Sequence, residues 1–107
     1  MNYEKAIHLL SEIESSKLYD LKKAFYSAAI NYAKIRMDYY EHNSERTSLE
    51  QQRTLSHNVF IDECNILSRT MINNNENALW RKELGSNRKE IGDFACFVAL
   101  LKSFETR

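Results

Sequence analysis

Apolar residues recur every three or four positions along most of this chain, which is the spacing expected of α-helices. The first such segment runs from Tyr3 to about Glu14, and Asn2 stands before it as a candidate N-cap. Ser15 and Ser16 then mark a break. The chain holds no proline and only two glycines, so little forces the backbone out of helical conformation. We therefore expect an all-α fold.

A heptad-like seam follows in the second segment, from Lys17 to about His42. Its apolar residues alternate at steps of three and four: Leu18, Leu21, Phe25, Ala28, Tyr32, Ile35 and Tyr39. A seam of this kind suits a long helix that packs antiparallel in a bundle or pairs with a second copy of the chain. Residues 18–39 therefore make a homodimer one of the partners to consider.

The polar run HNSERTS separates this helix from a third one. Thr47 with Glu50 has the spacing of a capping box, which favours a helix start near Thr47, although Ser44 offers an earlier cap. The third helix should end near Ile72. The asparagine-rich stretch that follows, residues 73–77, is typical of a loop, because asparagine tolerates turn and left-handed conformations.

Two further helices complete the expected fold. A short one covers about Ala78 to Leu84 and is closed by Gly85 at a C′-like position. Asn87 and Glu90 then resemble a capping pair in front of the last helix, IGDFACFVALLKSF, which is apolar on nearly every side and should be buried. The sequence thus predicts one domain, residues 1–107, with a four-helix-bundle-like fold and a short extra helix before the last.

A polar stripe lies on the third helix. At about 100° per residue, its members fall within roughly 60° of one another: Asn58, Asp62, Asn65 and Arg69. Apolar residues border the stripe on both sides, and the back of the helix is apolar as well: Phe60, Cys64, Leu67 and Met71. A polar band this narrow predicts a partly buried polar site.

Buried charges in such a site would need partners, because an unpaired ion is costly to desolvate. Asp93 is the only charge between Ile91 and Leu101, in a segment of the last helix with apolar residues all round it. A guanidinium could neutralise it through a bidentate contact, and the candidates are Arg69, Arg81 and Arg88.

Three interpretations of these residues stay open. They form an internal network that holds helix register, or they open to a pocket or groove that recognises a ligand or partner, or Asp62 or His57 acts as a catalytic base. Trp80 fits either a lid over the bundle end or an interface anchor. The candidate binding or network residues are His57, Asn58, Asp62, Asn65, Arg69, Trp80, Arg81, Arg88 and Asp93.

Composition narrows the function classes. Lys and Arg together number 15, as do Asp and Glu, so no net charge draws the chain to nucleic acid, and we expect no such partner. No segment has the apolar length of a membrane span or secretory signal, so we expect a cytoplasmic protein without a membrane partner. Cys64 and Cys96 lack ligand-like spacing and suggest small buried residues. We expect no metal, cofactor or catalytic residue.

Two segments of the C-terminal half resemble a known family. They are HNVFIDECNILSR, from His57 to Arg69, with the pattern HNxxIDxCNxLSR, and WRKELGSNRKEIGDFACF, from Trp80 to Phe97. Together they are similar to a family of small bacterial proteins of unknown function, mainly from Gram-positive bacteria. The resemblance implies a bacterial, cytosolic protein in which both segments belong to one spatial unit. It implies no activity, substrate or catalytic residue.

These observations favour a small, non-enzymatic interaction or regulatory protein with a semi-buried polar site on the third helix. One alternative is a small-metabolite-binding protein or enzyme that uses Asp62, Asn58 and Arg69. Another is an immunity protein or a protein of host–phage conflict, which would suit the size and fold by analogy alone.

Overall fold

Five helices make up the part of the chain that the structure, a computed structural model, describes: residues 1–41 and 46–105, with the side chains of 1–41 and 48–103. They are α1 (Tyr3–Glu14), α2 (Tyr19–Glu41), α3 (Arg46–Asn73), α4 (Leu79–Leu84) and α5 (Arg88–Glu105). The all-α prediction is confirmed, including the short helix before the last. Over this part, no helix is both long and apolar enough to cross a bilayer.

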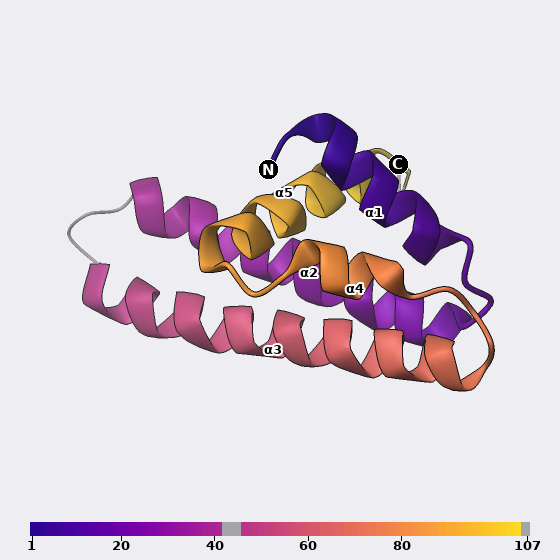
Figure 1. Cartoon of the computed structure of the whole chain (residues 1–107). Coiled ribbons are helices and arrows are strands. Elements are labelled where there is room, and N and C mark those ends of the chain that lie inside the picture. The colour runs from indigo at the N-terminus through magenta and orange to yellow at the C-terminus, as the bar shows by residue number, and fades with distance from the viewer. Residues whose placement is uncertain (42–45, 106–107) are drawn as a thin grey trace.

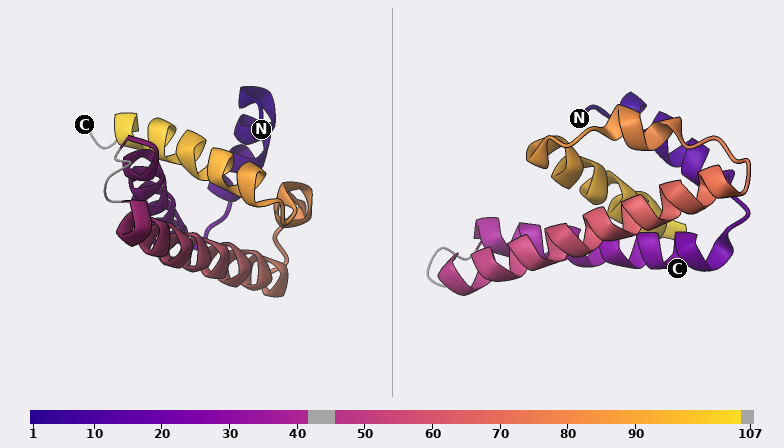
Figure 2. Two further views of the ribbon diagram at one scale, coloured as in Figure 1. Left: turned by 90° about the vertical axis from the view of Figure 1, so that its left-hand side faces the viewer. Right: turned by 60° about the horizontal axis from the view of Figure 1, so that its bottom comes forward.

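The two longest helices, α2 and α3, lie side by side and antiparallel, and they form one layer of the molecule (Figure 1). Helix α5 packs on α2 from the other layer, where α1 contacts both α4 and α5 (Figure 2). Helix α4 lies in this second layer and also contacts α3 of the first. The hydrophobic core lies between the layers. The molecule as a whole measures 47 × 26 × 25 Å.

Local signals set most helix ends where the sequence predicted them. The side-chain oxygen of Asn2 accepts a hydrogen bond from the Lys5 amide at 2.8 Å, and that of Asn87 accepts one from the Glu90 amide at 3.0 Å. Gly85, at φ 73°, ends α4 in a conformation that favours glycine. The predicted caps at Thr47 and Ser44, and the helix end at His42, involve groups outside the described residues.

The heptad seam of α2 is used inside the chain. Phe25 stands at its centre, with ring centroids 5.4 Å from Phe60, 6.0 Å from Trp80 and 6.2 Å from Phe94. Tyr32 continues the cluster, 6.1 Å from Phe60, and is 2% exposed. These aromatic contacts come from α2, α3, α4 and α5, so the centre of the seam joins both layers, and the homodimer through residues 18–39 stays a prediction.

Trp80 is neither of the two things that the sequence suggested. Its side chain is fully buried, and its indole Nε1 donates to the sulfur of Met71 at 3.4 Å. The Trp80 amide donates to a carboxylate oxygen of Glu12 on α1 at 2.9 Å. A helix of six residues is not stable alone. Helix α4 is therefore held in place by the packing of Trp80, its largest side chain, in the core.

Two turns are tied together at one end of the molecule by Glu76. Its carboxylate accepts from the Lys17 amide at 2.8 Å and from the Ser16 hydroxyl at 2.6 Å. These hydrogen bonds, the backbone one first, hold the pKa of Glu76 below its ordinary value. The predicted break at Ser15–Ser16 is therefore fixed by the asparagine-rich loop 60 residues further along.

Candidate functional site

The polar stripe of α3 is the solvent face of that helix, and the prediction of a partly buried site there is wrong. Asn58, Asp62 and Arg69 are exposed, and only Asn65 is half-buried. The opposite face enters the core through fully buried side chains: Phe60, Cys64, Leu67 and Met71. A helix at the edge of a two-layer fold buries one face, and the larger apolar side chains on the back decided which one.

Asn65 and Arg81 join two helices. The Arg81 Nε donates to the side-chain oxygen of Asn65 at 2.8 Å, and its Nη1 donates to the carbonyl of Gly85 at 2.8 Å. Arg69 instead donates to the backbone carbonyl of Asn65 in its own helix, at 3.2 Å. The expectation that the two resembling segments lie together is confirmed by the Arg81 contacts, whose role is to hold the end of α4 on α3.

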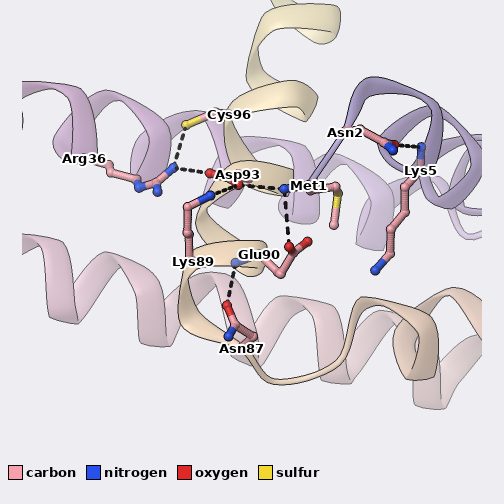
Figure 3. Close-up of polar contacts among 9 residues, drawn as sticks. All are labelled: Met1, Asn2, Lys5, Arg36, Asn87, Lys89, Glu90, Asp93 and Cys96. Atoms are coloured by element: carbon pink, nitrogen blue, oxygen red, sulfur yellow. Dashed lines mark hydrogen bonds and ion pairs between the residues drawn. The ribbon is translucent and has the colours of Figure 1, made fainter.

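Asp93 pairs with cations that the sequence analysis did not choose (Figure 3). Its carboxylate accepts from the N-terminal ammonium of Met1 at 2.8 Å, from Lys89 at 2.9 Å and from Arg36 at 3.3 Å. Arg69, Arg81 and Arg88 make other contacts, so the predicted pairing with one of them is wrong.

The surroundings of Asp93 set its ionisation. Burial opposes the charged form, but the hydrogen bonds from the ammonium, Lys89 and Arg36 outweigh it and lower the pKa of Asp93 to about 2. The site therefore holds a carboxylate that is ionised and fully engaged at neutral pH. The contacts of Asp93 with these three cations indicate that the group is a structural ion cluster.

Gly92 lets Arg36 cross the surface of α5. A Cβ atom at this position would lie 2.8 Å from the guanidinium carbon of Arg36, closer than such contacts occur in proteins. Arg36 reaches past Gly92 to Asp93 and to the sulfur of Cys96, at 3.5 Å from its Nη1. Cys96 is half-buried and Cys64 is fully buried, and both are free thiols.

A basic pocket opens on the other side of Arg36, where three helices meet. Its volume is about 350 Å³. The residues that line it are Tyr32, Arg36 and Tyr40 from α2, Arg53 from α3, and Arg88 and Lys89 from α5. Four cations and two phenols thus face one cavity, and no carboxylate is among the lining residues.

Two of these four cations, Arg53 and Arg88, have no acidic partner among the described side chains. Arg36 and Lys89 share Asp93, as described above. Among the described side chains, no carboxylate makes an ion pair with Arg53 or Arg88; Arg88 donates to the Thr54 hydroxyl at 3.2 Å. The Arg53 guanidinium lies 3.9 Å from the centroid of the Tyr39 ring, and its buried Nε has no hydrogen-bond partner in the part of the chain that the structure describes.

The neutral groups beside the pocket respond to this charge. Burial raises the pKa of Tyr32, and the positive charges of Arg36, Arg88 and Arg53 act against that rise. His57 packs edge-to-face on Tyr32 at 5.5 Å. Burial lowers the pKa of His57, a hydrogen bond that the ring donates to the side-chain oxygen of Asn58 opposes this, and Arg88 and Arg53 lower it further, so the ring is mainly neutral at pH 7. Its Nε2 is buried and has no hydrogen-bond partner among the described residues.

Of the sequence candidates, only Arg88 lines this pocket, and His57 adjoins it through Tyr32. The sequence analysis missed the other lining residues: Tyr32, Arg36, Tyr40, Arg53 and Lys89. A partial signal was present, because Tyr32, Arg36 and Tyr40 follow one another at i,i+4 spacing and so share one helix face. Nothing in the sequence indicated that Arg53 and Arg88 would meet them.

No family model, curated protein or solved structure matches this chain. The resemblance to small bacterial proteins therefore stays a prediction, and the argument for a site rests on the residues themselves.

Proposed function

We propose that this protein is a small, non-enzymatic regulatory protein that binds a phosphate-bearing small molecule in the basic pocket. The observation that carries the proposal is the convergence of Arg53 and Arg88 on one cavity without a carboxylate between them. Like charges held together in a folded protein repel, and an anion relieves that repulsion. Guanidinium groups match the geometry of phosphate oxygens and bind them through paired hydrogen bonds.

The size and lining of the pocket narrow the ligand class. A volume of about 350 Å³ is near the lower end of the range for small-molecule sites. Tyr32 and Tyr40 add aromatic surface and hydroxyl groups beside the cations. A phosphate monoester with a compact, flat organic part fits this combination. A nucleic-acid strand fits it less well, because the chain as a whole carries no net charge to hold a phosphate backbone.

The non-enzymatic part of the proposal follows from where the candidate bases lie. A general base must come within hydrogen-bond reach of the reacting group. Asp62 is exposed on the outer face of α3, and His57 does not line the pocket. The lining side chains are suited to binding and orienting an anion.

The test is calorimetric titration of the full chain with phenyl phosphate and with inorganic phosphate, at pH 7.5 and constant ionic strength. We expect saturable binding of phenyl phosphate. The double variant Arg53→Gln/Arg88→Gln should weaken it at least tenfold, since each hydrogen bond between charged groups contributes about 1.5–3 kcal/mol. Lys23→Gln is the matched control: it removes one positive charge from an exposed position of α2, outside the pocket.

Two results would contradict the proposal. One is heat that does not saturate with either phosphate compound. The other is an equal loss of affinity in Lys23→Gln and in the double variant, which would mean that the anion responds to overall charge. Unfolding curves of each variant show whether the chain is folded under the titration conditions.

A further inference from the structure

The outer face of α3 carries a second heptad pattern that the core does not use. Leu55, Val59, Asp62, Ile66 and Arg69 follow one another at steps of four, three, four and three. The exposed fractions of the apolar members are 65% for Leu55, 50% for Val59 and 38% for Ile66. Alternating steps of this kind keep residues on one side of a helix over several turns, which is the pattern of helices that pair lengthwise.

Two opposite charges interrupt this apolar row. Asp62 and Arg69 are seven residues apart, about 10 Å along the helix axis, so they cannot reach each other within one chain. Neither forms an ion pair within the side chains of residues 1–41 and 48–103. In an antiparallel, two-fold arrangement centred midway between them, Asp62 of each copy comes opposite Arg69 of the other.

We propose that this protein self-associates through the outer face of α3, antiparallel about a two-fold axis, with two reciprocal Asp62–Arg69 pairs. Ile66 of both copies then lies near the axis, Val59 of each copy lies opposite the last turn of the other α3, and Leu55 lies beyond the overlap. The partner that fits this face is a second copy of the chain, because an antiparallel copy places a positive charge opposite each negative one.

The size of the face predicts a weak dimer. With the axis midway between Asp62 and Arg69, the two copies of α3 overlap over residues 58–73, about 24 Å; a helix is about 10–12 Å wide, so the shared face covers about 240–290 Å² per copy. A standard stable interface covers about 800 Å² per partner. Association should therefore depend on protein concentration over the range used in solution measurements.

This interface differs from the one that the heptad seam of α2 suggested. The buried members of that seam, Phe25, Tyr32 and Tyr39, pack inside the chain, whereas Leu55, Val59 and Ile66 of α3 are exposed among the described residues. A second exposed apolar area lies between α2 and α5, where Ile30, Met37 and Leu100 border a groove of about 360 Å³. The residues that line this groove include no pair of opposite charges, so substitutions there serve as a control for the loss of exposed apolar area alone.

The decisive experiment uses charge reversal and mixing. Asp62→Arg and Arg69→Asp each place like charges opposite one another twice in the dimer, and each variant should weaken self-association at least tenfold in sedimentation equilibrium. The double variant Asp62→Arg/Arg69→Asp restores complementary pairs and should associate as the wild type does. An equimolar mixture of the two single variants should form a heterodimer, because one chain is then positive at both positions and the other negative.

Apolar variants give the second arm. Ile66→Ser should weaken association, whereas Leu100→Ser, at a position 54% exposed in the α2–α5 groove, should leave it unchanged. A wild type that stays monomeric at the highest soluble concentration would overturn the proposal. So would charge-reversed single variants that associate like the wild type, or that fail to recombine on mixing. Circular dichroism of each variant establishes that all of them are folded.

Discussion

The Asp93 cluster and the basic pocket share Arg36 and Lys89 but differ in how their charges are balanced. On one side of Arg36, a single carboxylate engages three cations at 2.8–3.3 Å. On the other side, Arg53 and Arg88 face a cavity with no carboxylate in its lining. When the charges of a cluster are balanced within the chain, a structural role is enough to account for them. A cluster left with excess charge is where an external ligand would change the energy most.

The difference arises from one crossing. Arg36 passes over Gly92, so its guanidinium borders the ion cluster and the pocket together. A substitution at Asp93 should therefore alter the pocket as well, and a substitution that moves Arg36 should affect both regions.

The largest expected effect comes from Asp93→Asn. It leaves the ammonium of Met1, Arg36 and Lys89 without their shared carboxylate. Breaking a buried ion pair costs about 3–5 kcal/mol, but one edge of Asp93 faces water, so we expect the free energy of unfolding to fall by about 1–2 kcal/mol. Denaturant unfolding at pH 7 measures this. Arg36 is then freed for the pocket, and phosphate should raise the melting temperature more in the variant than in the wild type.

The same variant carries a pH test. The pKa of Asp93 is about 2 in the folded chain and 3.8 is its ordinary value, so its contribution is complete above pH 4 and disappears as the pH falls toward 2. The wild type should lose this part of its stability over that interval, and Asp93→Asn should not. Lys89→Gln is the control, because an exposed i,i+4 ion pair is screened by water and contributes little to stability. Parallel acid curves for wild type and Asp93→Asn would contradict this account.

A smaller effect should appear at His57. The pKa of His57 is lower in the folded chain than its ordinary 6.5. Below pH 6.5 the unfolded chain therefore binds more protons than the folded chain, and the free energy of unfolding decreases as the pH is lowered. A phosphate in the pocket would offset Arg53 and Arg88 and raise the pKa of His57. Proton NMR titration with and without phenyl phosphate measures the shift, with His57→Gln to assign the signal. A titration midpoint that phosphate leaves unchanged would separate His57 from the pocket.

The smallest change in stability is expected from Gly92→Ala. Alanine favours a helix over glycine by up to about 1 kcal/mol, and the displacement of the Arg36 guanidinium opposes that gain. The net change should stay within about 1 kcal/mol, while the affinity for phenyl phosphate falls severalfold because Arg36 has moved. Titration calorimetry and denaturant unfolding of the one variant test both statements. Unaltered affinity would mean that the position of Arg36 does not matter to the pocket.

The candidate site was the least predictable part of the molecule. The stripe of Asn58, Asp62 and Arg69 was correctly placed on one side of a helix, since that follows from residue spacing alone. Its burial was not, because both sides of α3 carry apolar residues and the sequence does not say which side has a neighbour. Trp80 was misjudged for the same reason: a short helix gives no periodic signal of which side chains enter the core.

The features that could be predicted from residue order alone depend on neighbours within a few positions: the helices, the caps at Asn2 and Asn87, and the turn at Gly85. Only the tertiary structure decided which charges meet. Arg36 and Asp93 are 57 residues apart, and Arg53 and Arg88 belong to different helices, so their encounter depends on how the layers pack. Backbone hydrogen bonds and side-chain spacing act locally, whereas the balance of charge at a site is a property of the assembled fold.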